Sequence, residues 1–403
     1  MLTAIYNALS GMSAFETGLT MVGNNVANLN TPGFKVTEPM FSDVEAETQT
    51  GATVGSEGSP TEGSGVTLRQ NDQSFAQGQL STTNNPLDAA ISGEGFFVVQ
   101  QNGAYQYTRD GQFQIDSNGY LVSAANGARV MVSTASSAIG DFNINSYLSY
   151  APKATQNVYL SGNLAQSGQT GPYTLPGITV NDGSGGTETL SATFTQSTTN
   201  PLQWSVTVND AKNNQVGSGT VTFGSDGTPA TGSNTIALQV TPPNLPAFTV
   251  TLNFGTSGSY SGVTSIANNA TSQLQVQRQD GIAKGVLTQT SFDPGGNVTL
   301  TYSNGQTLTP AKLLLAQFQA PQQLQALGGG MYAATSGMKP QVGNPLTSSF
   351  GSIEGGELEM SNVDLTQQLT ELILLQRGFQ ASSQVSSAAN ELMQQLITMV
   401  NGQ

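Results

Sequence analysis

Apolar residues recur at every third or fourth position at both ends of this 403-residue chain, which places them on one side of an α-helix. In the first segment they are Leu2, Ile5, Leu9, Met12, Phe15, Leu19, Val22 and Val26. The last segment follows Ser361 and Asp364 at capping-box spacing, and its apolar residues are Leu365, Leu369, Leu372, Leu375, Phe379, Val385, Ala389, Leu392, Leu396 and Met399. The pattern predicts two terminal helices, the second roughly 55 Å long at ~1.5 Å per residue.

A hard stop follows the first helix in the sequence GNNVANLNTPGFK, residues 23–35. Asn28 and Asn30 suit a C-terminal cap, and Thr31-Pro32-Gly33 blocks continuation because proline lacks an amide donor and glycine admits positive φ. We expect this motif to redirect the chain. Its residues are Asn24, Asn25, Asn28, Thr31, Pro32, Gly33 and Phe34.

Each terminal helix needs a partner. The entropic cost of ordering the chain, ~1–2 kcal/mol per residue, cancels the free energy that one apolar stripe gains by burial. One interpretation is that both helices pack on their own domain. The other is a two-helix assembly element shared between subunits. The polar faces carry Gln, Ser and Asn with almost no charge, which favours the shared element, because a merely solvated helix usually carries Lys and Glu pairs.

Composition excludes several kinds of chemistry. The chain has no Cys and no His, so thiol nucleophiles, disulfides, thiolate metal sites and imidazole catalysis are excluded. It has 25 acidic and 11 basic residues, which disfavours nucleic acid and anionic lipid as partners. No run approaches the roughly 20 apolar residues of a membrane span, and the N-terminus lacks the basic start of a secretory signal peptide. We expect no membrane insertion, and a leaderless route if the protein is exported.

The middle of the chain predicts β-structure. Residues 46–65 form a Gly/Ser/Thr linker, and the following stretch is a meander punctuated by Asn102-Gly103, Asp110-Gly111 and Asn118-Gly119. Further along, apolar residues alternate with polar ones, which predicts strands with one buried side, as in a sandwich or barrel. These residues are Leu190, Ala192, Phe194, Trp204, Val206, Val208, Ile236, Leu238, Val240, Phe248, Val250, Leu252 and Phe254.

Three features of this β region could carry chemistry, and each has a structural interpretation that we favour. Asp110 and Asp116 could form a carboxylate pair for glycoside hydrolysis, but both lie in Asp-Gly or Asp-Ser-Asn-Gly turns, where Asp is the usual structural residue. Residues 181–186, NDGSGG, resemble a calcium-binding repeat that occurs only once. Trp204 could stack on a sugar, but its strand position predicts core packing. We therefore expect no enzyme activity, no cofactor and no metal.

Three stretches resemble one known family. NNVANLNTPGFK is similar to the N-terminal signature of the bacterial flagellar rod and hook axial proteins, and SNVDLTQQLTELILLQRGFQASSQ is similar to their C-terminal one. NNPLDAAISGEGFFVVQQNGAYQYTRDGQF resembles their common β core. The resemblance covers roughly residues 1–150 and 285–403, and the β insertion between these ranges resembles hook subunits rather than the shorter distal rod subunit.

The resemblance implies an α+β, multidomain fold. Its long N- and C-terminal helices would be paired as a coiled-coil-like core, with mainly antiparallel, sandwich- or barrel-like β domains between them. Residues 1–34 with 361–403 would form a terminal helical polymerisation domain. Residues 35–75 would be an extended linker, 76–150 with 285–360 a discontinuous β core domain, and 151–284 an inserted outer β domain.

The resemblance also implies a function. Subunits of this family are exported unfolded by the flagellar type III apparatus and polymerise into an extracellular helical tube, whose inside is lined by the terminal helices. A hook tube is a flexible universal joint that transmits torque from rod to filament, and its partners are the rod, the hook cap and the hook–filament junction proteins. Two alternatives stay open on the residues alone: a distal rod subunit, and a leaderless secreted β protein that binds carbohydrate.

Overall fold

The computed structural model describes residues 2–44, 65–68, 72–134, 138–167, 171–243, 245–267, 271–347 and 349–401. The predicted linker 46–65 lies outside these residues except for Gly65. The chain divides into two compact units. The first contains Met1–Asn145, Thr290–Leu300 and Leu308–Gln403, and the second contains Ser146–Gln289 and Thr301–Thr307.

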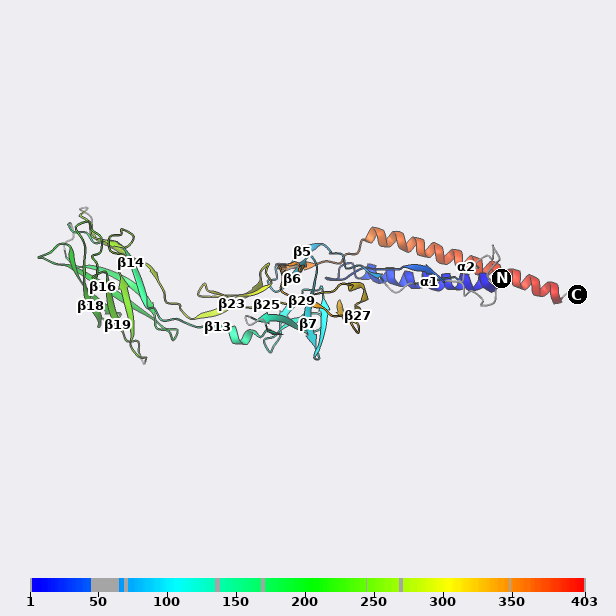
Figure 1. Ribbon diagram of the computed structural model, residues 1–403, viewed down its shortest axis with the longest axis horizontal. Helices are drawn as coiled ribbons and strands as arrows, with labels where there is room; N and C mark the ends of the chain where they lie inside the picture. The colour runs from blue at the N-terminus through cyan, green and yellow to red at the C-terminus, as the bar shows by residue number, and fades with distance from the viewer. Residues whose placement is uncertain are drawn as a thin grey trace, which may run out of the picture. The chain divides into compact units, whose positions relative to one another are not determined.

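Two long helices form the ends of the chain and belong to the first unit (Figure 1). They are α1 (Leu2–Ala27) and α2 (Leu365–Asn401), so the predicted terminal helices are confirmed. The predicted N-terminal cap of α2 was wrong in one respect. Asp364, rather than Ser361, is the cap, because its Oδ1 accepts hydrogen bonds from the backbone N–H groups of Thr366 (2.8 Å) and Gln367 (3.2 Å).

The first unit also contains most of a branched, largely antiparallel sheet. One path through it has the strand order β27-β28-β8-β7-β26-β29, and β11 joins β7 beside β26. Four two-stranded sheets, β1-β4, β2-β3, β30-β6 and β31-β5, accompany it. Aromatic side chains fill its core, where the ring of Phe96 lies edge-on to those of Phe75, Phe318 and Tyr332. Two of the two-stranded sheets, β1-β4 and β2-β3, lie within the predicted linker 35–75, so this segment includes short paired strands.

The strands of the first unit have the following bounds: β1 (Thr37–Glu38), β2 (Phe41–Asp43), β3 (Val66–Leu68), β4 (Asp72–Gln73), β5 (Leu80–Thr82), β6 (Ala89–Ser92), β7 (Phe96–Gln101), β8 (Ala104–Thr108), β9 (Phe113–Ile115), β10 (Leu121–Ser123), β11 (Arg129–Thr134), β12 (Ile139–Asp141), β26 (Leu315–Gln317), β27 (Gln325–Gly328), β28 (Met331–Ala333), β29 (Gln341–Gly343), β30 (Ser352–Gly355) and β31 (Glu357–Glu359). Two short 3₁₀ helices span Ile144–Tyr147 and Pro321–Gln323. Three strands have residues in both units: β23 (Gly285–Phe292), β24 (Asn297–Tyr302) and β25 (Thr307–Leu313).

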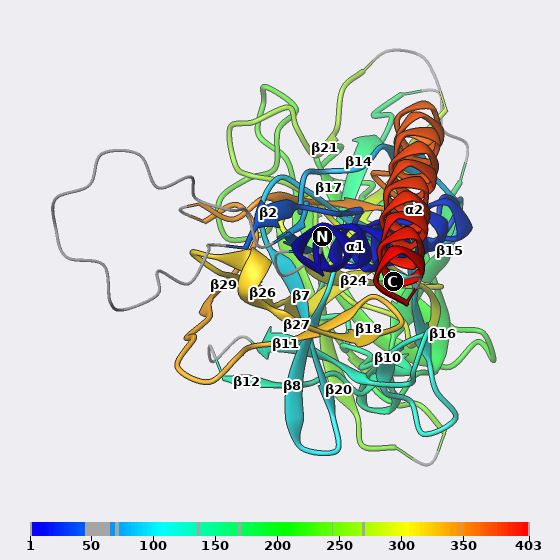
Figure 2. The same cartoon turned by 90° about the vertical axis from the view of Figure 1, so that its right-hand side faces the viewer.

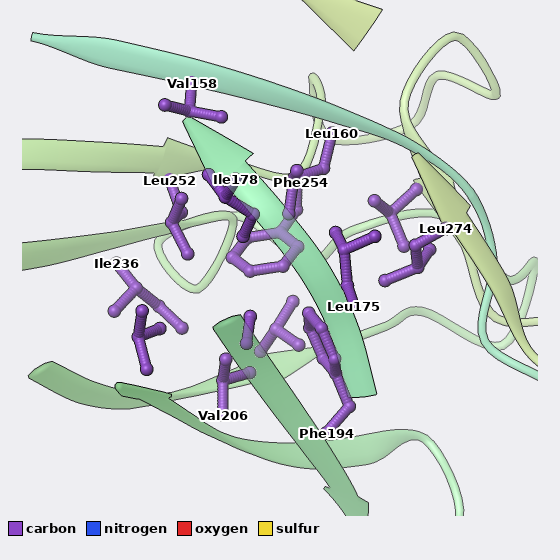
Figure 3. Close-up of a cluster of buried hydrophobic side chains, with 14 of the residues drawn as sticks. Val158, Leu160, Leu175, Ile178, Phe194, Val206, Ile236, Leu252, Phe254 and Leu274 are labelled. Atoms are coloured by element: carbon purple, nitrogen blue, oxygen red, sulfur yellow. The ribbon is translucent and has the colours of Figure 1, made fainter. Parts of the chain in front are cut away.

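The second unit is built of two sheets that enclose one apolar core (Figure 3). The first has the order β15-β16-β17-β18, and the second has the order β19-β20-β14-β21 with β22 also paired to β14. Their pairs are antiparallel except that β14 runs parallel to β20 and β21. The strands are β13 (Ser149–Tyr150), β14 (Asn157–Asn163), β15 (Tyr173–Asn181), β16 (Thr187–Gln196), β17 (Gln203–Asp210), β18 (Gln215–Thr222), β19 (Thr235–Val240), β20 (Phe248–Asn253), β21 (Val263–Thr264) and β22 (Gln273–Gln279).

The period-two pattern in this unit is confirmed. Every residue that it assigns to the core is buried, apart from the partly buried Phe248 that packs against the core. Among the turns, Asn102-Gly103 closes the β7–β8 hairpin with positive φ at both residues (51° and 83°). Asp110-Gly111 forms no hairpin, because β8 pairs with β7 and β28 whereas β9 pairs with β10.

Candidate functional site: the terminal helix pair and its buried clamp

The two terminal helices pack against each other in antiparallel register (Figure 1). A Cβ at Gly378 would lie 2.6 Å from the Phe15 ring, and a Cβ at Gly18 would lie 3.1 Å from Leu375 Cδ2. Nearer the start of α1, a Cβ at Gly11 would lie 2.9 Å from a serine hydroxyl of α2. We call this line of contact the helix seam, and it is built largely of small residues that let the two helices approach closely.

One polar pair fixes the register of the helix seam. The Asn25 side chain is almost fully buried and donates through Nδ2 to Gln368 Oε1 (2.9 Å) and to the Thr37 carbonyl (2.8 Å). Its Oδ1 accepts from the Thr37 N–H (3.1 Å). Buried amides must be matched to partners, and any other register of the helices would break the hydrogen bond between Asn25 and Gln368 and leave the buried Gln368 oxygen without this donor.

The large apolar residues predicted for a polymer interface differ in how far the single chain covers them. Val22 and Leu375 are buried, and Ile5, Met12, Phe15, Leu19, Val26 and Leu372 are half-buried. Leu9, Leu365, Leu369, Phe379, Leu392, Leu396 and Met399 are exposed, and Leu2 begins α1. Tyr6, Ile373, Leu374 and Ile397, which the sequence stripe did not include, are exposed as well. The single chain therefore leaves an uncovered apolar face along α2.

The predicted redirecting motif ends α1 and turns the chain into the β region. Asn28 donates from its side chain to Asn24 Oδ1 (2.6 Å), and the Thr31 hydroxyl donates to Asn28 Oδ1 (3.1 Å). Gly33 has φ of 69°, and its N–H donates to the Glu359 carbonyl oxygen (2.7 Å). A Cβ at Gly33 would lie 2.6 Å from the backbone nitrogen of Asp110, so only glycine fits. Of the other motif members, Asn24 and Thr31 are exposed, whereas Pro32 and Phe34 are half-buried.

A buried ionic cluster lies directly beyond this turn, and we call it the clamp. Lys35 Nζ donates to Glu359 Oε1 (2.6 Å) and to the Ala76 carbonyl (2.8 Å). Arg109 Nη1 donates to Glu359 Oε2 (3.3 Å), and the Gly78 N–H donates to Glu359 Oε1 (2.8 Å). All three charged side chains are almost completely buried. The clamp thus joins the segment after α1, the end of β8 and the strand before α2.

Burial sets the electrostatics of this region. Loss of solvation lowers the pKa of Lys35 and of Arg109, and the Glu359 carboxylate opposes that shift in both cases. Burial also raises the pKa of Asp110 to about 6, against a hydrogen bond from the Gln112 N–H and together with the charge of Asp88. The clamp holds two cations and one carboxylate, so Glu359 is its critical member.

The predicted pairing of the two terminal helices is confirmed, whereas sequence reasoning missed the clamp and the part that glycines play in the helix seam. Lys35, Arg109 and Glu359 are far apart in the sequence, and charged residues are expected at the surface. The seam had a visible signal, because Gly11 and Gly18 are seven residues apart, two helical turns along one face.

The residues considered for chemistry have structural roles. Asp116 Oδ1 accepts from the backbone N–H groups of Asn118 (2.9 Å) and Tyr120 (2.8 Å), which holds a turn. In the loop 181–186, Asp182 Oδ1 likewise accepts from three backbone N–H groups. Trp204 is fully buried, as its position predicted, and donates to Ser265 Oγ (3.3 Å).

The acidic residues in the described part of the chain form no group of three that could hold a metal ion. Within the same ranges, neither helix is long and apolar enough to cross a membrane.

Known proteins match the chain at both ends and in the middle. Family models for the flagellar basal body rod FlgEFG protein C-terminal region, the flagellar hook protein FlgE/F/G D1 domain and the flagella basal body rod protein match residues 354–399, 90–228 and 5–35. The flagellar hook protein FlgE of Brucella suis is 30% identical over 414 residues, 97% of each chain. That of Borreliella burgdorferi is 29% identical over 445 residues, 100% of each chain.

A solved structure, that of Helicobacter pylori flagellar hook protein FlgE2, matches 70% of this chain and 100% of its own with 14% identity and a TM-score of 0.49. The two full-length matches are both to flagellar hook proteins, and they include the two terminal helices and the redirecting motif. The chain belongs to the FlgE family of flagellar hook proteins.

Proposed function

We propose that this structural subunit of the flagellar hook polymerises through the uncovered apolar face of α2. The proposal rests on one observation: some residues of α2 contact α1, and others are left exposed. Glycines, one amide pair, Leu375 and Phe15 pair α2 with α1, whereas other large apolar side chains of α2, such as Leu374 (65% exposed) and Met399 (67% exposed), are uncovered. Large apolar side chains left exposed in this number along one helix are typical of a protein–protein interface.

The pairing register adds a second feature to this face. The contacts of Gly11 with Ser382 and of Asn25 with Gln368 place the start of α1 beside Glu391. The rest of α2, which includes Leu396 and Ile397, therefore extends beyond α1. Each large apolar side chain gains ~1.5–3 kcal/mol when it is fully buried, so coverage by helices of neighbouring copies would strongly favour assembly.

We propose that the helices form a coiled-coil-like layer along the inside of the tube. Gln368, Leu375, Ser382 and Ala389 recur every seven residues, and all four are buried or half-buried, which supports such packing. The division into a helical domain (1–34 with 361–403), a linker (35–75), a β core (76–150 with 285–360) and an outer domain (151–284) belongs to this proposal. The outer domain would lie furthest from the axis.

The wider setting follows from the same family membership. We propose that the subunit leaves the cell through the flagellar type III apparatus without a cleaved signal peptide, and works as a torque-transmitting universal joint. Its partners would be further copies of itself, the rod, the hook cap and the hook–filament junction proteins. The full-length relatives are hook proteins, so the distal rod and carbohydrate-binding alternatives are not favoured.

Substitution on α2 tests the proposal. Leu374→Asp would place a carboxylate in the interface, where burial without a partner costs several kcal/mol per subunit. We expect monomer with an unchanged helical circular dichroism signal and no tubes by electron microscopy. Gln384→Asp, at an exposed position of α2 whose neighbours one turn away are Gln, Ala and Ser, is the matched control and should form tubes. Normal tubes from Leu374→Asp would show that this face stays uncovered.

A further inference from the structure

A cleft of about 1290 Å³ lies in the first unit, between the redirecting motif and the β27–β28 hairpin. Its walls carry side-chain amides, such as those of Asn24, Asn28 and Gln112, and apolar groups, such as Pro32 and Phe34. Asp110 is its one charged lining residue. Mixed amide and apolar walls suit an extended polypeptide, whose backbone needs hydrogen bonds and whose side chains need apolar contact.

The far wall of the cleft is a free sheet edge. β27 lies at one end of the strand order β27-β28-β8-β7-β26-β29, and within the described parts of the chain it pairs with β28 alone. All four of its residues are exposed, and none is charged or proline. Such an edge presents unpaired backbone donors and acceptors and lacks the usual protection against strand addition.

The opposite end of the same sheet carries a second free edge, next to a strained apolar residue. β29 pairs, among the residues described, only with β26 (Figure 2). The turn after it holds Leu346 at φ of 61°, a left-handed conformation that side-chain-bearing residues rarely adopt, with the side chain 63% exposed. The Leu346 N–H donates to the Gly351 carbonyl (3.2 Å), which fixes the turn. Strained residues cluster at functional sites, so the exposed Leu346 side chain is a candidate contact.

We infer that β29 and Leu346 of one copy dock in the cleft beside β27 of the next copy. The inference rests on the proposed polymerisation and adds a contact outside the terminal helices. The two edges differ, so their pairing is head-to-tail and propagates without closing, as a helical polymer requires. The second copy is favoured over an unrelated partner because one chain carries both halves of the contact.

Charge supports the same pairing. Lys339 is exposed and lies two residues before β29, and Asp110 lines the cleft that would receive this segment. Neither edge strand carries a charge of its own, so no repulsion opposes the contact.

Cross-linking tests the inference, because the chain has no cysteine of its own. Tubes assembled from the double variant Leu346→Cys/Ala326→Cys should, after oxidation, give a ladder of oligomers on a denaturing gel. Ala326 lines the cleft on β27. The double variant Leu346→Cys/Ala104→Cys, with its second cysteine on an exposed alanine of β8, is the control and should give no ladder.

Each outcome has a distinct meaning. Tubes of the 346/326 variant without a ladder would overturn the docking and leave the polymerisation intact. Failure of the unmodified chain to form tubes would instead refute the proposed function. A second variant covers the case in which the cysteines block assembly: Leu346→Asp should reduce tube yield at least tenfold relative to Tyr105→Asp, a substitution of another half-exposed side chain in the same unit. Equal yields would overturn the docking.

Discussion

Replacement of Glu359 by glutamine should destabilise the first unit more than any other conservative change in the clamp. The substitution keeps the size of the side chain and removes its charge. Lys35 and Arg109 would then remain buried without a counter-charge, and the new amide group would face donors rather than acceptors. No other carboxylate forms an ion pair with either cation among the described residues.

The expected magnitude follows from the geometry of the three groups. Removing one partner of a buried ion pair costs about 3–5 kcal/mol, and here one carboxylate serves two cations. Lys35→Met is the comparison, because it leaves one cation and one carboxylate. It removes the lysine donor of the Ala76 carbonyl, which keeps a hydrogen bond from Asn362 Nδ2 (3.1 Å), so this loss is about 0.5–1.5 kcal/mol. The double variant should cost less than the sum of the two, since the pair couples by about 0.5–3 kcal/mol.

The two units can be followed by different signals in one experiment. Both long helices belong to the first unit, so circular dichroism at 222 nm follows its unfolding in urea. The single tryptophan, Trp204, lies in the core of the second unit, and its fluorescence is an internal control. We expect Glu359→Gln to lower the urea midpoint at 222 nm and to leave the fluorescence midpoint unchanged.

Two results would refute this reasoning. If Glu359→Gln cost no more than Lys35→Met, charge balance would not govern the clamp. If both midpoints fell together, the clamp would not be confined to the first unit.

Three further outcomes test the site. Asp110→Asn should stabilise the first unit at pH 7, because the Asp110 carboxyl has a pKa of about 6 in the folded chain and 3.8 otherwise. Between about pH 4 and 6 the carboxyl ionises more readily in the unfolded chain, so the unvaried protein loses up to about 3 kcal/mol of stability as the pH rises. The urea midpoint of the variant should not fall over this pH range. Gly33→Ala should lower the free energy of unfolding by about 1 kcal/mol for the left-handed backbone and by a further 1–3 kcal/mol, roughly, for overpacking. Gly232 also has a positive φ (82°) but has open space around it, so Gly232→Ala should show only the backbone cost, measured by tryptophan fluorescence. Asn25→Ala should lower the free energy of unfolding of the first unit, followed at 222 nm, by about 1–3 kcal/mol. Asn24→Ala, at an exposed position, should change this free energy by under about 0.5 kcal/mol.

Local patterns made much of the fold predictable. The step of three or four residues marked both helices, and the alternation around Trp204 marked the strands of the second unit, because each depends on neighbours in the sequence. Asn102-Gly103 likewise predicted the β7–β8 hairpin, because a tight turn depends on two adjacent residues. Pro32 and Gly33 correctly placed the end of the first helix.

The contacts that organise the site were beyond such patterns. Glu359 meets Lys35 and Arg109 only after the chain has folded, and its charge predicted a surface position. Large apolar side chains were predicted to form the polymer interface, and within the chain Gly18 and Gly378 let α1 and α2 approach closely. The sequence pattern identified which residues are apolar, and only the packing separates the face that is covered within the chain from the face that is not.

The clamp also defines a route for mechanical load. A twisting force on α1 or α2 reaches the β region through the short segments that leave these helices, and Lys35 and Glu359 lie on those two segments. Covalent connection alone would let each segment swivel about its backbone dihedrals. The Glu359 carboxylate, which accepts hydrogen bonds from residues 35, 78 and 109, instead fixes both segments to the sheet, so that they move with it. In a hook that rotates while it is bent, this coupling would make the surrounding strands rotate together with the helices, with little lag between them.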